Sequence, residues 1–275
     1  MRKIGIELEF SDELANTSYD ELENKIKTIV HANGQSFSRS EHNARWTLKG
    51  EHCGYELTSP AMEATQENFQ KIHNVVDQTR QIFNGRNVIR RNCGFHVHLD
   101  ISDYTRNEHH RSLINLFRCY EPCLLSILPA SRTGNDYVRR LGRMSGLSDL
   151  ARSNNILENV SRYDLNDHML ALNYSRYNSS RKTVEVRYAA GTMKPRKVVN
   201  WTRLMAFIAE AAKLKNYVFI PGCQLEGFKE FVRSTETNTW LDSGRRELVS
   251  WIQQRADDRA RRDLAVQERR SRQNA

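Results

Sequence analysis

The stretch that most constrains the fold is Cys93-Gly94-Phe95-His96-Val97-His98-Leu99-Asp100, in which apolar and polar residues alternate. This alternation is typical of a β-strand with one buried face, because successive side chains of a strand point to opposite sides. We therefore expect the apolar residues in the core and both histidines on the polar face, about 7 Å apart. His-X-His also occurs in ordinary surface strands, so the pattern needs support from elsewhere in the chain.

Three further stretches repeat the alternation and carry acidic residues on their polar face. Residues 3–10 predict one strand. Residues 54–60 predict a second strand that runs into a helix, with Ser59 as the helix N-cap. Residues 169–174 and 183–188 predict a hairpin. The polar residues that these strands present are Glu7, Glu9, Glu56, Glu185 and Arg187.

If one sheet holds these strands, four carboxylates, two imidazoles and a guanidinium share one concavity. Repulsion among four carboxylates is costly unless cations neutralise it. Oxygen ligands favour Mg²⁺, or Mn²⁺, over zinc. Arg187 is suited to a phosphate oxygen, and the sequence holds neither G-x-x-x-x-G-K-[ST] nor G-x-G-x-x-G. This combination predicts a nucleoside triphosphate and divalent cations on an open sheet.

The overall composition narrows the class of protein further. A net charge of +9 favours anionic partners such as nucleotides, acidic substrates or nucleic acid. No apolar run approaches the about 18 residues that span a bilayer, and the first residues resemble a strand rather than a signal peptide. Five cysteines without a C-x-x-C pair indicate a reducing compartment, so we expect a cytoplasmic protein. A zinc site of Cys53, Cys93, His96 and His98 is an alternative that lacks the paired spacings of structural zinc.

Helical periodicity is expected at several places between and after the strands. Residues 18–32 predict a helix that Ser18 caps. Residues 107–128 predict a longer helix whose first turn, with His109 and His110, is solvated.

Two arginine-rich segments show less regular patterns. Residues 130–165 predict a mobile flap whose guanidinium groups reach a polyphosphate. From Arg255 onward the apolar period fades, which predicts a solvated helix or a disordered tail. The arginines of this tail offer a contact for nucleic acid or another partner.

Four motifs, in this order, resemble the carboxylate–amine ligase superfamily, which includes glutamine synthetase, glutamate–cysteine ligase and the smaller amidoligases. The motifs span residues 4–195, and the chain after about residue 235 lies outside the resemblance. We therefore expect an amidoligase-like domain over residues 1–235 and a helical, Arg-rich tail over residues 236–275. The motifs are Gly5-Ile6-Glu7-Leu8-Glu9-Phe10, Tyr55-Glu56-Leu57-Thr58-Ser59-Pro60, Cys93-Gly94-Phe95-His96-Val97-His98, and Thr183-Val184-Glu185-Val186-Arg187 with Gly191-Thr192.

The resemblance implies an α+β fold with a curved, mainly antiparallel sheet and helices packed on its outer face. It also implies that ATP and Mg²⁺ serve to phosphorylate a carboxylate, after which an amine displaces the phosphate. By the same resemblance the catalytic residues are Glu185, Arg187 and Glu7. The residues implied as metal ligands are Glu7, Glu9, Glu56, His96 and Glu185. Those implied as contacts for phosphate or substrate are Arg187, Arg162, Tyr163, Asn173 and His98.

The expected partners are a small-molecule or peptide carboxylate and an amine, and the sequence leaves their identity and the oligomeric state open. One alternative is a metal-dependent hydrolase that uses the same side chains without a nucleotide. Another is a nucleic-acid-binding protein that depends on the net charge and the arginine-rich tail.

Overall fold

The predicted strands form one antiparallel sheet. A computed structural model describes residues 2–11, 13, 16–40, 44–84, 86–132, 138–143, 165, 167, 169–177 and 181–273. Within these residues the strand order is β2-β3-β1-β5-β7-β6, with the short β4 paired to the beginning of β1. The strands are β1 (Lys3–Phe10), β2 (Thr47–Glu51), β3 (Gly54–Thr58), β4 (Met62–Glu63), β5 (Gly94–Asp100), β6 (Leu172–Asn173) and β7 (Thr183–Ala190).

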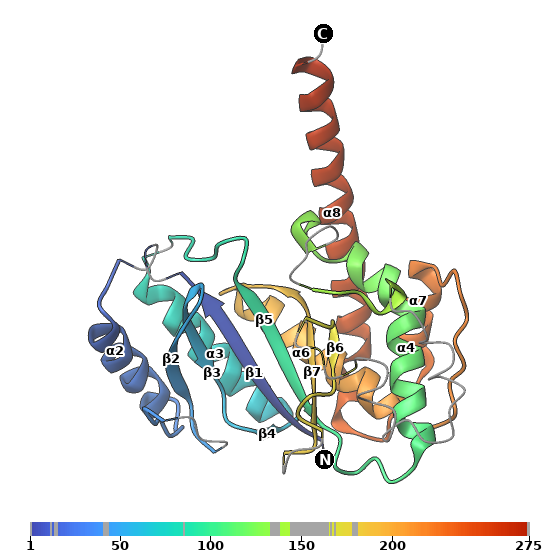
Figure 1. Cartoon of the computed structure of the whole chain (residues 1–275), viewed down its shortest axis with the longest axis horizontal. Coiled ribbons are helices and arrows are strands. Elements are labelled where there is room, and N and C mark those ends of the chain that lie inside the picture. The colour runs from blue at the N-terminus through green and yellow to red at the C-terminus, as the bar shows by residue number, and fades with distance from the viewer. Residues whose placement is uncertain are drawn as a thin grey trace.

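Helices cover one face of this open sheet and continue beyond its β6 edge (Figure 1). The α+β class is confirmed, together with the antiparallel arrangement of the strands. The helices α3 and α6 pack against each other, and α2 packs on α3. The described α-helices are α2 (Tyr19–Ala32), α3 (Gln66–Ile82), α4 (Asn107–Ser126), α6 (Pro195–Ala211), α7 (Leu225–Ser234) and α8 (Arg245–Gln273).

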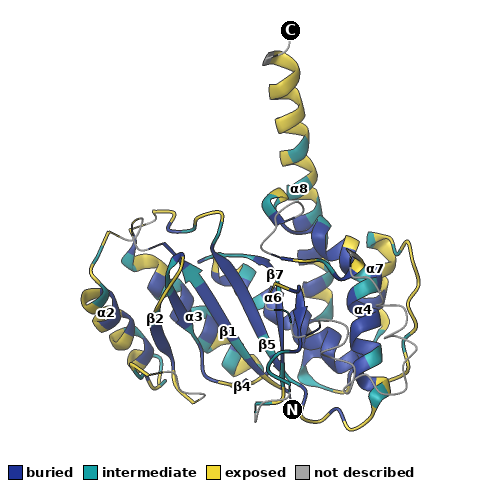
Figure 2. Cartoon of the chain, viewed as in Figure 1, coloured by how far each residue is buried: buried dark blue, intermediate teal, exposed yellow. Residues whose placement is uncertain are grey.

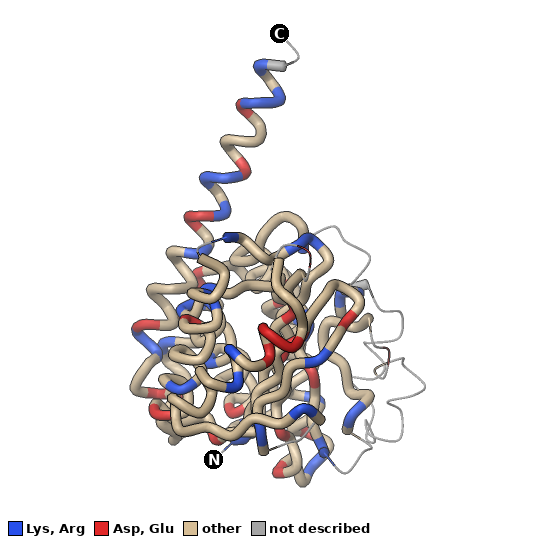
Figure 3. The backbone as a smooth tube through the Cα atoms, turned by 90° about the vertical axis from the view of Figure 1, so that its left-hand side faces the viewer, with Lys and Arg blue, Asp and Glu red and all other residues tan. Residues whose placement is uncertain are grey.

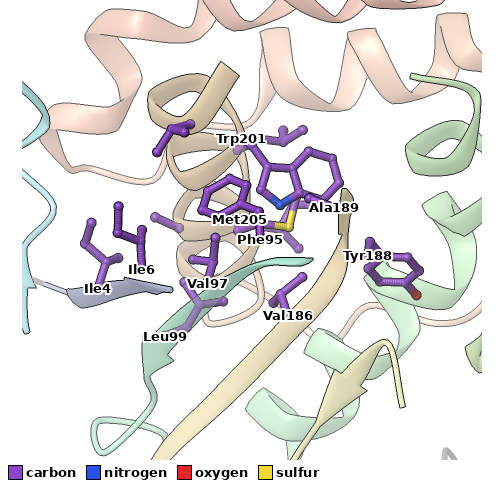
Figure 4. Packing of buried hydrophobic residues seen from close by; sticks show 14 of the residues in the cluster. Ile4, Ile6, Phe95, Val97, Leu99, Val186, Tyr188, Ala189, Trp201 and Met205 are labelled. Carbon is purple, nitrogen blue, oxygen red and sulfur yellow. The ribbon is translucent and has the colours of Figure 1, made fainter. Parts of the chain in front are cut away.

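The apolar face of the strands packs directly on α6. Ile4 and Ile6 of β1 and Val97 of β5 are at most 1% exposed. Trp201 and Met205 of α6 lie over this face (Figure 4). Because the side chains of a strand alternate, burying this face commits the acidic residues and histidines of the same strands to the opposite face.

The C-terminal helix α8 has two parts with different surroundings. Leu248, Trp251 and Ile252 in its first half belong to the hydrophobic core. Its second half projects from the body of the protein and is exposed (Figure 2). Basic and acidic residues are interleaved along this projecting part (Figure 3). The expectation of a solvated helix therefore holds for the second half, and the domain boundary at residue 235 stays a prediction.

Two local predictions are wrong. Ser59 does not cap a helix: its hydroxyl accepts a hydrogen bond from the backbone N–H of Ile6 at 2.9 Å, and α3 begins only at Gln66, capped by Thr65. His109 and His110 are not solvated, because they are 7% and 0% exposed. In contrast, Ser18 caps α2 as predicted by accepting from the N–H of Glu21.

No described helix is both long enough and apolar enough to cross a membrane.

Candidate active site

The register of the central strands brings the predicted site residues together. Glu7 of β1 lies opposite His96 of β5. On its other side β1 pairs with β3, so that Glu9 lies opposite Glu56. His98 of β5 lies opposite Glu185 of β7. Side chains at directly opposed positions share one face of a sheet, so three neighbouring pairings place the acidic and imidazole groups in one cluster.

Glu7 lies at the centre of this cluster. One of its carboxylate oxygens lies 2.9 Å from Nε2 of His98, and the other lies 3.3 Å from Nδ1 of His96. The same Nδ1 of His96 is 3.3 Å from a carboxylate oxygen of Glu185. Glu7, His96 and Glu185 are each at most 8% exposed, so these groups meet in a largely desolvated space.

Two ligand sets of metal-binding size overlap at Glu7. Glu7, His98 and Glu185 form one, and Glu7, Glu56 and His96 form the other. Within each set the ligand atoms lie within 4.8 Å of one another. Among the described residues the sets of this kind hold only carboxylate and imidazole ligands, so no cysteine-containing zinc site is among them.

Arg187 reaches the cluster from a β-bulge. Between Phe95 and Val97 of β5 the facing strand β7 holds one residue more than a regular ladder would. The guanidinium of Arg187 donates to Glu185 and lies 3.4 Å from Nδ1 of His96. Arg187 thus offers a fixed positive charge beside the two ligand sets.

The remaining cluster residues are held by neighbours that the sequence analysis did not single out. The backbone N–H of Gly94 donates to Glu9 at 2.6 Å. A Cβ at position 94 would lie 2.5 Å from Nε2 of His96, so only glycine leaves the imidazole in place. Lys49 of β2 pairs with Glu56 at 2.9 Å.

Burial and the charges of neighbouring groups shift the pKa values of Glu7, Glu56 and His98. Burial opposes ionisation of Glu7, but the charge of His98 and hydrogen bonding to His96 outweigh it and hold the Glu7 pKa well below its usual range. Burial and the charge of Glu7 raise the pKa of Glu56 to about 7, against the effect of Lys49. For His98, burial opposes the charged form, yet the charge of Glu7 raises its pKa. The cluster therefore stores carboxylate repulsion that a bound cation would relieve.

Two pockets open on the polar face, on either side of the cluster. One has a volume of about 430 Å³ and is lined by Gly5, Glu7, His98, Arg176 and Arg181, among others. The other has a volume of about 280 Å³, and its lining includes Glu9, Cys53, His96, Arg132 and Arg187. A molecule in either pocket would contact the Glu/His cluster from its own end of the strands.

The thiols near the second pocket also have perturbed acidity. Hydrogen bonding between Cys53 and Cys93, ahead of the opposing effect of burial, lowers the pKa of Cys93 to about 7. The same hydrogen bond and burial raise the pKa of Cys53, whose thiol also donates to Glu9 at 3.6 Å. The neighbouring Arg132 is buried, and its guanidinium donates to the backbone carbonyl of Cys93.

The structure therefore brings together all five implied metal ligands, together with Arg187 and His98. Asn173 is fully buried, and its amide donates to Glu185 at 3.3 Å, so it holds a cluster residue. Arg162 and Tyr163 lie outside the described residues. Their assignment as phosphate or substrate contacts stays a prediction, as do the roles of the other site residues.

The sequence analysis missed Lys49 and Gly94 as members of the site. Lys49 alternates with the buried Leu48, a strand signal in a stretch that is otherwise polar. Gly94 carries a signal only through its position two residues before His96. Arg132 belongs to the arginine-rich segment 130–165, whose guanidinium groups were predicted to reach a phosphate, and it lies near Glu9. Residues 133–137 and 144–164 of that segment lie outside the described residues, so the predicted flap stays a prediction.

An antiparallel α+β fold with a carboxylate–imidazole cluster on its open face is the class that these observations define. The family model described as "Putative amidoligase enzyme" matches residues 1–209, which hold every residue of the cluster. The chain therefore belongs to this amidoligase family and is by that membership an enzyme of ligase type. No curated protein matches the chain significantly.

Proposed function

We propose that this protein is an ATP- and Mg²⁺-dependent carboxylate–amine ligase that forms an amide or isopeptide bond through an acyl phosphate. The observation that carries the proposal is the pair of ligand sets that share Glu7 on one sheet face. The proposal includes a glutamine synthetase-like curvature of the sheet, which would gather its polar face around the substrates. The expected substrates are a small-molecule or peptide carboxylate and an amine.

The residues present fit divalent cations. Nε2 of His98 is buried and lies 2.9 Å from a carboxylate oxygen of Glu7, with which it forms an ion pair when the imidazole is protonated. Loss of that proton would leave a nitrogen and an oxygen close enough to bind one ion. Glu7, His98 and Glu185 would hold one ion, and Glu7, Glu56 and His96 a second, with Glu9 beside them. Oxygen-rich sets of this kind favour Mg²⁺ or Mn²⁺.

In the proposed reaction an oxygen of the substrate carboxylate attacks the γ-phosphorus of ATP, and the bond from that phosphorus to the leaving ADP breaks. The amine nitrogen then attacks the acyl carbon, inorganic phosphate leaves, and a nearby carboxylate accepts the proton that the nitrogen loses. Bound Mg²⁺ supplies charge neutralisation for the phosphates. Arg187 supplies a guanidinium for the charge that spreads over the oxygens of the transferred group.

The two pockets support a division of the substrates between the ends of the cluster. Arg176 and Arg181 line the larger pocket, and Arg132 and Arg187 line the smaller one. Each pocket thus offers positive charge to an anionic substrate, while Glu7 lines the first and His96 the second. Groups bound from the two ends would meet over the cluster, where phosphoryl transfer needs close positioning.

The proposal is tested by measuring ADP release from ATP and Mg²⁺ with a panel of amino acids, peptides and amines. We expect at least one carboxylate and amine pair to stimulate ADP release, with loss of the activity when EDTA is added. Product mass should equal the sum of both substrates less one water. Turnover of a substrate with metal alone, and no requirement for ATP, would instead identify a metal-dependent hydrolase.

A further inference from the structure

A further pocket with a polar lining lies on the helical side of the sheet, away from the Glu/His cluster. It has a volume of about 420 Å³ and lies among α3, α6, the 3₁₀ helix η3 (Trp240–Gly244) and the start of α8. Helix α6 separates it from the sheet, because Trp201 and Met205 face the strands while Asn200 and Arg203 line the pocket (Figure 4).

Buried polar atoms at this pocket lack partners. Asn200 is 1% exposed, and its side-chain amide nitrogen has no hydrogen-bond partner. The same holds for Nε of Arg203, which is 6% exposed, and for Nδ1 of His73. Leaving a buried donor unpaired costs free energy, so these groups are more stable when an acceptor reaches them.

The pocket also has an excess of positive charge. Arg203 is neutralised by Glu247, whose carboxylate lies 2.8 Å from it. Arg196, which is exposed at the pocket, has no ion pair among the residues that the structure describes, and Glu247 is the single acidic residue in the lining. The lining therefore carries a net charge of about +1 with His73 neutral, which favours an anion.

Aromatic rings form another part of the wall. Trp240 and Phe69 lie with their ring centroids 5.7 Å apart and their planes inclined by 32°. The guanidinium of Arg203 lies 5.1 Å from the centroid of the Trp240 ring. A flat or apolar part of a ligand can pack on such a surface, while its charged group pairs with Arg196.

We propose that this pocket binds a small organic anion, a carboxylate or a phosphate that also carries hydrogen-bonding groups. Trp240 and Glu247 come from the C-terminal segment, beyond the residues that the amidoligase family model covers. The site is thus a feature of this chain and is separate from the cluster to which we assign the ligase reaction.

The experiment titrates the full-length protein by calorimetry with inorganic phosphate, L-glutamate and AMP, in buffer that a chelating resin has freed of divalent cations. Removing the cations disables the proposed ATP site without adding a competing anion, and the variants below assign the remaining binding to the helical face. We expect saturable binding of at least one probe. Phosphate and AMP identify a phosphate ligand, and glutamate identifies a carboxylate ligand.

Substitutions in and outside the pocket test where the probe binds. Arg196→Ala should weaken binding about 10-fold or more, because it removes a charge-assisted hydrogen bond. Arg196→Lys keeps the charge and should bind more tightly than Arg196→Ala. Arg80→Ala, which removes an exposed arginine of α3 outside the pocket, should bind as the wild type does.

A second variant tests the pocket without touching Arg196. A Cβ at Gly244 would collide with the guanidinium of Arg203, so Gly244→Ala should displace Arg203 and weaken binding, and its melting curve would verify folding. The proposal is overturned if no probe binds saturably, or if Arg196→Ala binds the probe as tightly as the wild type does. Neither result would affect the ligase proposal, which depends on ADP release with Mg²⁺.

Discussion

The two faces of the central sheet use the same strands for opposite purposes. On one face Ile4, Ile6 and Val97 are packed against α6 with almost no exposed surface (Figure 4). On the other face Glu7 and His96, from the same strands, are nearly as buried but lie among charged groups. Burial of apolar groups stabilises the fold, whereas burial of like charges destabilises it unless partners or ions compensate. The comparison predicts that the two faces can be perturbed independently.

The largest expected effect is a loss of catalysis, caused by substitutions on the polar face. Glu7→Gln and Glu185→Gln each replace a carboxylate of the ligand sets with an amide of nearly the same shape. We expect ATP turnover to fall by about 10³-fold, the upper range for losing a preorganised electrostatic group. ADP release with a stimulating substrate pair measures this.

The matched control for these variants is the melting temperature. Glu7→Gln removes the ion-pair partner of His98 and Glu185→Gln that of Arg187, so both variants should melt below the wild type and yet stay folded at the assay temperature in the absence of divalent cations. A variant that keeps wild-type turnover, or one that loses activity only because it unfolds, would break the assignment of chemistry to this face.

The next largest effect is on stability, from the apolar face. Ile4→Ala should lower the free energy of unfolding by about 2–5 kcal/mol, because Ile4 is 1% exposed and its removal leaves a cavity. Its neighbour Lys3 is exposed and points to the other face, so Lys3→Ala should change the free energy by about 0.5 kcal/mol at most. Urea unfolding of both variants checks the difference. Equal effects at these adjacent positions would mean that the two faces are not separable.

Which face each strand residue takes could be predicted from the sequence, because side-chain alternation is a local property. Glu7, His96 and Glu185 were predicted to share a face from period alone, and their meeting required only that the three strands pair. The exact ligand sets could not be predicted, since they depend on register and on the bulge that brings Arg187 to His96. Register follows from long-range pairing rather than from local pattern.

The wrong predictions arose where a distant partner replaced a local one. The sequence around Ser59 has the form of a helix start, but its hydroxyl instead bonds to the backbone of Ile6, 53 residues earlier. His110 lies in a first helical turn that would be solvated in isolation. The rings of Tyr174 and Tyr177, which follow β6 much later in the chain, pack against it. Neither partner leaves a mark in the neighbouring sequence.

The third expected effect is a dependence of stability on pH. It arises from His110, an imidazole whose burial no opposite charge offsets. Burial lowers the pKa of His110 to about 4, while the unfolded chain takes up the proton near pH 6.5. The stabilisation from keeping this imidazole neutral is present above pH 6.5 and is lost as the pH falls toward 4. This single group should therefore cost up to about 3 kcal/mol over that range.

Urea unfolding at pH 7, 5.5 and 4.5 measures this loss. His110→Phe should flatten the dependence, because phenylalanine cannot be protonated and suits the aromatic surroundings. His31→Phe, which removes an exposed histidine of α2, should keep the full dependence. If His110→Phe and His31→Phe show the same pH profile, burial of His110 is not the source of the acid sensitivity.

The smallest expected effect is a rise in melting temperature when a cation binds, and it measures the difference between the two faces most directly. A cation bound at ten times its Kd stabilises the folded state by about 1.4 kcal/mol, which should raise the melting temperature by roughly 3–6 °C for a chain of this size. Mg²⁺ or Mn²⁺ should produce this shift in the wild type.

Glu56→Gln should reduce this shift. It should also raise the melting temperature in EDTA, because the substitution removes a carboxylate whose pKa is raised by burial and by the charge of Glu7. Ile4→Ala should melt earlier yet keep the full shift, since its defect lies on the other face. If no divalent cation changes the melting temperature of the wild type, the carboxylates of the polar face are neutralised by protons and by Lys49 rather than by metal.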